Sequence, residues 1–407
     1  MFEQIRSNRI RSFVLVAFMG AFLVALGWLL GLTFADNGAA GLVVALVIFG
    51  ILNLVAYFQG DSILLSVAGA RKIQQKDHPR LYNVVEEIKI ASQLEKMPDV
   101  YIIDDQALNA FATGRDINHA SVAITSGLLQ KLNRDELQGV IAHEIGHVKN
   151  RDVLLMAICG VLLGTIVILS YYGSRILLYG GMSGGSRRSS RNSGGGGGVA
   201  IIAIVALVLM ILAPIFTQLI YLAVSRRREY LADASSALYT RNPEGLASAL
   251  EKLAASGTPV KNANQATAPM YIVNPFKGRS VNAGELTSTH PPIQERIRIL
   301  RAMAGNVSYV SYNKAFQQVK HTRAGVMSSQ TASLMGETVS AQPPSPEKTS
   351  LEPAAEKIER SREVSDLMYR LNDYRTIDCD CGARLKIPPA LRGQVVRCPH
   401  CGTMHQT

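Results

Sequence analysis

The sequence predicts an α-helical membrane protein, mainly α, with a soluble α+β domain and a small C-terminal β module. Hydrophobic residues make up 48% of the 407 residues and aromatic residues 6%, and much of the apolar content lies in long uncharged runs. Such runs are typical of membrane-spanning helices. Segments of helical and strand periodicity lie between them, and two close cysteine pairs stand near the C-terminus.

Residues 1–60 contain two of these runs, at 13–34 and 41–58, separated by a short turn at 36–38. Each run is long enough to cross a bilayer, so we expect a transmembrane hairpin. A cleaved signal peptide is the alternative for the first run. That run is too long for the apolar region of a signal peptide and has no clear small-residue cleavage site.

The formal net charge of +11 could indicate a nucleic-acid-binding protein. The basic residues are spread out, however, and many stand at the edges of apolar runs: Arg6, Arg9, Arg11, Arg71, Lys72, Arg226, Arg227 and Arg228. Anchoring at the inner leaflet of a membrane explains this pattern better. We therefore expect the lipid bilayer as a partner, no nucleic acid, and these flanking segments on the cytoplasmic side.

A soluble segment begins near residue 78, with a predicted helix at 81–94 and predicted strands at 100–103, 109–114 and 121–125. These strands would form a small sheet. An exposed edge of such a sheet can hold an extended peptide by backbone hydrogen bonds, whatever its side chains. Taken alone, Asn109 is more simply interpreted as an ordinary turn residue.

The next helix carries the central motif, His143-Glu144-Ile145-Gly146-His147. Asn133 and Glu136 form a predicted capping box, and apolar residues recur at helical spacing behind them. Histidines at i and i+4 lie on one face and can bind one Zn²⁺, which leaves Glu144 beside the open position to take a proton from bound water. The alternative is a pair of surface histidines that flank a charge.

Two more apolar runs, 153–172 and 199–224, enclose a Gly/Ser/Arg-rich tract at 180–198. We expect 153–224 to form a second membrane hairpin. Arginines in the connecting part oppose the positive-inside tendency, so the pair could instead dip into the membrane or pack on the soluble domain. In either arrangement the chain returns to the side from which it left.

Glu229 and Asp233 form a second i, i+4 pair, just after this hairpin. Zinc held by two histidines needs a third protein ligand, and Glu229 can supply it. Asp233 could accept a hydrogen bond from the far nitrogen of a ligand histidine. Without the upstream histidine motif, a solvated helix charge would be the better interpretation of Glu229.

Residues 322–375 are rich in Ser, Pro, Glu, Thr and Ala and are predicted to be a disordered linker, apart from a possible helix near 354–371. Residues 376–407 then contain two cysteine pairs, Cys379 with Cys381 and Cys398 with Cys401. Two such pairs are typical of a closed structural zinc site, here a zinc ribbon. A closed site has no open coordination position, so we expect a stabilising or docking module that could bind a protein partner.

The chain resembles the HtpX family of membrane-bound zinc metalloendopeptidases, relatives of the CAAX prenyl endopeptidases. The resemblance runs from the first hairpin to about residue 300, and the C-terminal ribbon is an addition to the usual family layout. It rests on the histidine motif and, in order along the chain, on Asn109-Ala110-Phe111-Ala112-Thr113-Gly114, Arg228-Glu229-Tyr230-Leu231-Ala232-Asp233, Thr289-His290-Pro291-Pro292 and Glu295-Arg296-Ile297.

This resemblance implies a zincin-like (gluzincin) catalytic domain at 61–321 in a multi-pass inner-membrane protein, with domain and ribbon facing the cytoplasm. It implies hydrolysis of misfolded or damaged membrane proteins, in quality control and stress response. The residue roles that it implies are zinc ligation by His143, His147 and Glu229, a base at Glu144, support by Asp233, transition-state stabilisation by His290, and a substrate edge at Asn109, Ala110 and Phe111.

Two other functions remain open from the sequence. Processing of prenylated CAAX proteins is the nearest alternative activity, although that branch encloses its site within more than the four candidate membrane helices found here. A membrane scaffold that uses zinc only structurally is an alternative of a different class. It would bind zinc but show no cleavage that depends on Glu144.

Overall fold

The computed structural model describes residues 37–154, 226–263, 267–276, 290–303, 305–334, 339–342 and 354–407, together with isolated positions between 10 and 28 and at 157 and 158. The predicted first run at 13–34 lies almost entirely outside the described residues. The predicted second hairpin, 153–224, does so as well.

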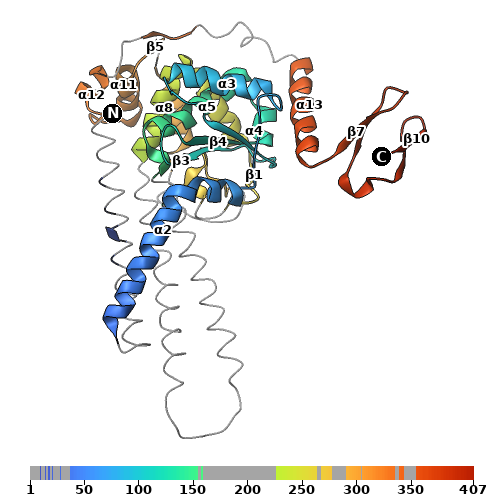
Figure 1. Ribbon diagram of the computed structural model, residues 1–407. Coiled ribbons are helices and arrows are strands. Elements are labelled where there is room, and N and C mark those ends of the chain that lie inside the picture. Colours follow the sequence, from blue (N-terminus) through green and yellow to red (C-terminus); the bar gives the residue numbers. More distant parts are fainter. Residues whose placement is uncertain are drawn as a thin grey trace, which may run out of the picture.

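A long apolar helix, α2 (Gly38–Val67), extends away from the folded body (Figure 1). The Asn37 side chain caps it by accepting a hydrogen bond from the Ala40 amide, and large apolar side chains such as Val43, Val47 and Leu54 are exposed along it. Within the described residues, this is the one helix long and apolar enough to cross a membrane. It contains the predicted run 41–58 and continues beyond it.

The soluble part contains a four-stranded sheet made of β1 (Ala70–Lys72), β2 (Asp99–Ile103), β3 (Ala110–Gly114) and β4 (Ala120–Thr125). The strand order is β1-β2-β4-β3, with β2 parallel to β4 and the other pairs antiparallel. The three predicted strands are confirmed, and the short β1 is an addition. Strand β3 lies at one edge of the sheet, so one side of its backbone faces away from the other strands.

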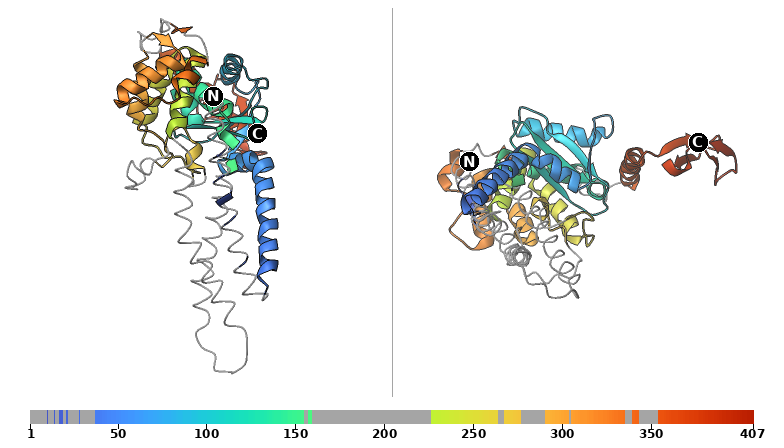
Figure 2. Two further views of the ribbon diagram at one scale, coloured as in Figure 1. Left: turned by 90° about the vertical axis from the view of Figure 1, so that its left-hand side faces the viewer. Right: turned by 60° about the horizontal axis from the view of Figure 1, so that its bottom comes forward.

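Helices cover this sheet and enclose the main core (Figures 1 and 2). The predicted helix at 81–94 is α3 (Pro79–Ala91), and the predicted histidine helix is α5 (Arg134–Lys149). The other helices of this body are α4 (Ser126–Lys131), α8 (Arg226–Thr240), α9 (Pro243–Ala255), α10 (Ile293–Arg301) and α11 (Tyr309–Lys320).

Two sets of hydrogen bonds hold the start of α5, one within the helix cap and one to the neighbouring helix α9. The predicted capping box is confirmed, because Asn133 Oδ1 accepts from the Glu136 amide at 2.9 Å and Glu136 Oε2 accepts from the Asn133 amide at 2.8 Å. Glu136 also accepts hydrogen bonds from Ser248 and Lys252 of α9. The carboxylate that caps the helix thus also docks its neighbour.

The predicted disordered linker at 322–375 is in part wrong. Within it the structure contains α12 (Ser329–Leu334), β6 (Val339–Ser340), which pairs with β5 (Asn306–Val307), and α13 (Ala354–Leu371). Helix α13 is the possible helix of the sequence analysis, and it packs against α4. It buries Val364 and Leu367, and Arg360 Nε donates to the Gln130 carbonyl at 2.8 Å. An amphipathic stripe gives this polar stretch enough apolar surface to fold onto the body.

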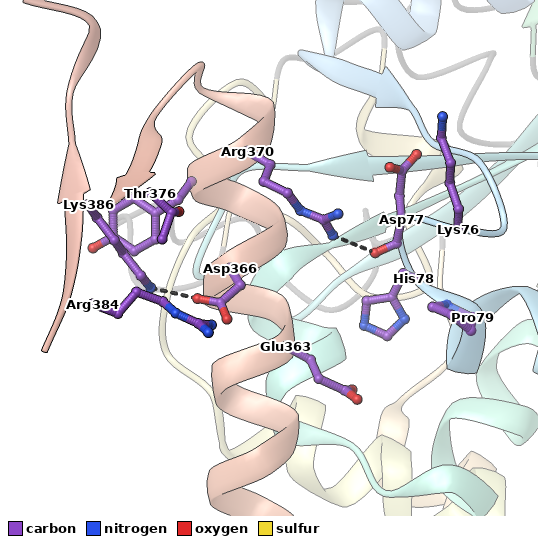
Figure 3. A pocket seen from close by; sticks show the side chains of 11 residues that line it. Lys76, Asp77, His78, Pro79, Glu363, Asp366, Arg370, Thr376, Arg384 and Lys386 are labelled. Carbon is purple, nitrogen blue, oxygen red and sulfur yellow. Dashed lines mark hydrogen bonds and ion pairs between the residues drawn. The ribbon is translucent and has the colours of Figure 1, made fainter. Parts of the chain in front are cut away.

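A cavity of about 440 Å³ lies where α13 meets the loop before α3 (Figure 3). Arg370 Nη2 of α13 donates to the Asp77 carbonyl at 2.9 Å on one side of it. On the other side, Lys386 Nζ donates to Asp366 Oδ1 at 2.7 Å. These contacts connect the C-terminal module to the body through α13.

The C-terminal module consists of two hairpins, β7 (Arg375–Asp378) with β8 (Arg384–Ile387) and β9 (Val395–Arg397) with β10 (Met404–Gln406). The apolar residues between the two cysteine pairs, Leu385, Ile387, Val395 and Val396, lie in β8 and β9. The module stands apart from the body, with α13 between them (Figures 1 and 2).

Candidate metal centre

His143 and His147 lie one turn apart on α5, and both point into the protein. Their rings meet edge to face with centroids 4.8 Å apart, and their Nε2 atoms are 3.3 Å apart. His143 is fully buried and His147 is 17% exposed. The alternative of two surface histidines is therefore wrong.

Helix α8 brings Glu229 to this pair because it packs closely on α5. A Cβ atom at Gly146 would lie 3.1 Å from Cβ of Ser235 and 3.3 Å from Cα of Ala232, so glycine permits the close approach. Ser236 Oγ of α8 also donates to the Gly139 carbonyl of α5 at 2.7 Å. Packing between helices far apart in sequence thus places the third potential ligand.

The three side chains fit a zinc ion. Glu229 Oε2 lies 3.7 Å from His143 Nε2, and Glu229 Oε1 lies 3.5 Å from His147 Nε2. Tetrahedral zinc with nitrogen and oxygen ligands places its donor atoms roughly 3.3 to 3.6 Å apart. Two imidazoles and one carboxylate are also the donor set of catalytic zinc sites, which keep one position open.

Each histidine has its own carboxylate on the side away from the ligand group. Asp233 Oδ1 lies 2.9 Å from His143 Nδ1, as the sequence predicted for one ligand histidine. Asp152 Oδ2 lies 3.3 Å from His147 Nδ1, and this partner was not predicted. A carboxylate at Nδ1 fixes the tautomer that leaves the Nε2 lone pair for a metal.

Arg296 of α10 holds Asp233 in place. Its Nε and Nη2 atoms donate to the two carboxylate oxygens at 2.9 and 2.7 Å, and its side chain is almost fully buried. Burial by itself would raise the pKa of Asp233, but the charge of Arg296 and the bonded His143 outweigh it and lower that pKa. Asp233 therefore stays an acceptor for His143.

Glu144 lies beside the ligand group without joining it. It is buried, and burial raises its pKa to about 7, an effect that His147 and a backbone hydrogen bond from Ala112 of β3 partly offset. Its Oε1 atom accepts no hydrogen bond from the described residues. A carboxylate in this state can exchange a proton near neutral pH.

The electrostatics of the ligands favour a bound cation. Burial would raise the pKa of Glu229, yet His290, His147 and Arg296 together hold that pKa well below its usual value. Burial would likewise lower the pKa of His147, but Asp152, Glu229 and Glu144 raise it to about 9. In His143 burial dominates and lowers the pKa to about 4.

His290 also reaches this centre, just before α10. Its Nδ1 atom lies 3.2 Å from Glu229 Oε2, and the residue is 8% exposed. Pro291 and Pro292 fix the approach of the chain to the helix. His290 is thus held at the centre and is not a solvent-exposed residue at a helix start.

The predicted substrate edge lies next to Glu144. The inner side of β3 pairs with β4, and its outer side faces residues 267–276, which we call the covering segment. The Ala110 carbonyl accepts from the Ile272 amide at 3.0 Å, and Asn109 Nδ2 donates to the Val273 carbonyl at 3.0 Å. Phe111 packs on Tyr271 instead of facing the ligand group. Asn109, Ala110 and Phe111 thus line the edge, but their outward groups already have partners.

Asp152 was not predicted as a functional residue, and Arg296 had no predicted role. Asp152 follows the histidine helix after a break at Asn150 and Arg151, so helical spacing could not connect it to His147. Arg296 belongs to a motif that was noted, but its partner Asp233 is 63 residues away. The one signal in the sequence that could have indicated Asp152 is its position, five residues after His147.

Residues 75–304 match the model of peptidase family M48. The match covers more than half of the chain and includes every residue of the centre described above. The chain belongs to peptidase family M48. It is therefore a metalloprotease, and its family favours this class over the non-catalytic scaffold.

Named relatives of this M48 chain are proteases as well. It is 44% identical over 302 residues to a protein named Protease HtpX homolog from Dictyoglomus turgidum, covering 74% of this chain and 94% of the relative. It is 44% identical over 303 residues to a protein of the same name from Streptococcus pyogenes serotype M28, covering 74% of this chain and 100% of the relative.

Among solved structures, the M48 chain is similar to Ste24p from S. mikatae. The TM-score is 0.39 and the sequence identity 20%, with coverage of 74% of this chain and 67% of the other.

The four C-terminal cysteines lie outside the M48 match and come together in a second group. Cys379 Sγ lies 3.4 Å from Cys401 Sγ, and Cys381 Sγ lies 3.8 Å from Cys398 Sγ. Tetrahedral zinc with four thiolates places its sulfurs roughly 3.8 Å apart. Gly382 and Gly402 follow the two pairs with φ near +80°, which permits both tight knuckles although the first is one residue shorter.

Proposed function

We propose that the chain is a membrane-anchored zinc endopeptidase that cleaves extended segments of misfolded or damaged membrane proteins at the cytoplasmic face of the inner membrane. The observation that carries the proposal is the convergence of His143, His147 and Glu229 at zinc-ligand distances, with Glu144 beside them and the edge of β3 next to Glu144.

His143, His147 and Glu229 would hold the zinc ion. When bound, zinc supplies Lewis-acid chemistry, which makes water more acidic and polarises a peptide carbonyl. Glu144 accepts the proton of the attacking water at its carboxylate and then passes it to the departing amine nitrogen. Asp233 and Asp152 keep the histidine rings oriented, and His290 donates a hydrogen bond to the carbonyl oxygen as it gains negative charge.

The substrate would bind as an extended strand on the outer edge of β3. Asn109, Ala110 and Phe111 would hold it mainly through backbone groups, which tolerates many side-chain sequences. A protease with this kind of recognition needs an unfolded or locally extended substrate. That requirement favours misfolded proteins over folded ones.

The membrane location has two supports. Helix α2 is apolar over most of its length and exposes large side chains such as Val43, Val47 and Leu54, as expected for a helix in lipid. Arg71 and Lys72 stand four and five residues after its last residue, Val67, and would lie at the cytoplasmic surface. The active domain follows on the same side and would meet cytoplasmic segments of membrane proteins.

We propose that the cysteine group of 376–407 holds a second, structural zinc ion. Its four sulfurs form a closed set, so it has no position for water or substrate. The module would then act in docking a protein partner or in stabilising the C-terminal part of the chain.

The test uses the full-length protein in detergent with its zinc bound. Glu144→Gln should abolish cleavage of unstructured β-casein and of a misfolded membrane protein, with about two zinc ions per chain retained, because Glu144 is not a ligand. Asp135→Asn, which neutralises another carboxylate of α5 far from the centre, is the matched control and should cleave normally. Cleavage that persists in Glu144→Gln would rule out the assigned base.

A further inference from the structure

The covering segment, residues 267–276, lies on the edge of β3 as a peptide substrate would. The Ile272 amide donates to the Ala110 carbonyl at 3.0 Å. The Val273 amide lies 3.5 Å from Asn109 Oδ1, and Asn109 Nδ2 donates to the Val273 carbonyl at 3.0 Å. Ile272 is thus opposite Ala110 and Val273 opposite Asn109, which is an antiparallel arrangement. The Ala110 carbonyl and the Asn109 side chain, which face outward at the start of the edge, are thus in use.

Apolar contacts hold this segment as well. The ring of Tyr271 meets the ring of Phe111 edge to face, with centroids 5.2 Å apart. Residues 268–273 are all buried. Near its end, the Pro275 carbonyl accepts from the Val260 amide at 3.0 Å. The segment is packed onto the body at several points.

Arg296 connects the segment to the metal centre. Its Nη1 atom donates to the Ile272 carbonyl at 3.1 Å, while its other nitrogens hold Asp233. The guanidinium group that orients the support of His143 therefore also binds the backbone of the covering segment. A substrate carbonyl in the same place would find the same donor.

The segment leaves little room above the centre. The cavity lined by Ala112, Glu144, His147 and residues 269–272 has a volume of about 20 Å³. That volume suffices for about one water molecule, whereas binding sites for drug-sized ligands measure about 300 Å³ or more. The cavity beside Glu144 is thus too small for a peptide while the segment is in this position.

We propose that residues 268–273 act as a built-in competitor that occupies the substrate edge and keeps the enzyme latent until substrate displaces them. The inference rests on the proposed function and adds its regulation. Only open molecules bind substrate. The apparent affinity is therefore the intrinsic affinity multiplied by the fraction of molecules that are open. Loosening the segment should therefore raise activity, which is the opposite of what damage to a catalytic part would do.

Ile272→Pro tests this directly. Proline removes the amide that donates to Ala110, and Tyr271 has φ −72° and ψ 146°, a conformation that is favourable before proline. We expect kcat/KM for an unstructured reporter peptide to rise roughly 2- to 12-fold, the effect of losing one hydrogen bond from the closed state. Zinc content should not change.

Ala341→Pro is the matched control. It removes a backbone amide that donates to the Gly305 carbonyl at 2.8 Å, remote from the centre. Its kcat/KM should equal that of the wild type. Equal or lower activity of folded Ile272→Pro would overturn the proposal, as would an equal rise in both variants.

Hydrogen exchange gives a second test that needs no change in the segment. In full-length Glu144→Gln, saturating β-casein should speed exchange of the Ile272 and Val273 amides. The Thr125 amide, which donates to the Asn109 carbonyl on the inner side of β3 at 3.1 Å, should stay protected. Unchanged or slower exchange at 272 and 273 would overturn the proposal even if Ile272→Pro does not fold.

The two proposals fail in different ways. If the wild type makes no product that depends on Glu144, both the proposed function and the latency are wrong. If that cleavage occurs while exchange of the segment is unchanged by bound casein, only the latency is wrong.

Discussion

Asp233 Oδ1 lies 2.9 Å from Nδ1 of His143, and Asp152 holds the corresponding place 3.3 Å from Nδ1 of His147. The two carboxylates come from different parts of the chain, one on α8 and one after α5. Asp233 is itself held by Arg296, whereas Asp152 Oδ1 lies 3.6 Å from Arg228 Nε. A carboxylate at Nδ1 thus orients each of the two imidazoles whose Nε2 atoms face the metal site.

Asp233 and Asp152 should each contribute measurably to the affinity for zinc. We expect Asp233→Asn and Asp152→Asn each to weaken zinc binding by roughly 10- to 100-fold at pH 9 or above, where His147 has no proton to lose; this is the usual effect of changing a ligand's hydrogen-bond partner. Glu229→Ala should instead remove one of about two zinc ions per chain, because it deletes a ligand. Chelator competition and metal analysis measure both. Wild-type affinity in the Asp152 variant would show that this contact does not orient His147.

Zinc binding at the catalytic site should depend on pH. The pKa of His147 in the metal-free protein is raised to about 9, so at pH 7 His147 carries a proton that it must lose to bind zinc. Affinity should therefore rise by about tenfold per pH unit between pH 6 and 8 and level off above pH 9.

Calorimetry in buffers of different ionisation enthalpy should detect the released proton. The matched comparison is Asp152→Asn, which removes a group that raises the pKa of His147 and should shift the rise to lower pH. A binding constant that is independent of pH over this range would contradict the prediction.

His290 should matter mainly in the transition state. We expect His290→Phe to lower kcat by roughly 10²- to 10³-fold with little change in KM, the range for loss of one oxyanion donor. Zinc should be retained, because His290 lies against Glu229 and is not needed to complete the ligand set. Loss of zinc would show that its main role is to hold Glu229, and unchanged kcat would exclude the donor role.

Helix α13 should stabilise the protease domain, whereas the zinc ribbon beyond it should not. Leu367 is buried against the body, so Leu367→Ala should lower the free energy of unfolding by about 2 to 5 kcal/mol. A chain that ends after Tyr374 should keep its Tm and its cleavage of casein.

Calorimetric melts of the two variants check this, with Ile358→Ala, an exposed position of the same helix, as the control. Complete loss of activity in the shortened chain would make the ribbon part of the catalytic unit.

Features that depend on local spacing along the chain could be predicted before the fold was known. The capping box at Asn133 and the apolar periodicity after it define α5, and the i, i+4 spacing places His143 and His147 on one face. Short segments of strand-forming residues, separated by turn residues, define β2, β3 and β4, and the spacing of the cysteine pairs defines the two knuckles. These patterns are local because neighbours along a helix, strand or turn are fixed by backbone geometry.

Tertiary structure decided which distant groups meet. The spacing suggested Asp233 as a partner for a histidine but not for which one, and it gave no partner to Arg296 and no role to Asp152. It also could not show that α13 packs on α4 or that Ile272 pairs with Ala110. Contacts of α13 with the body join residues that are 230 and 293 positions apart. They depend on how whole helices pack, which no local pattern of residues encodes.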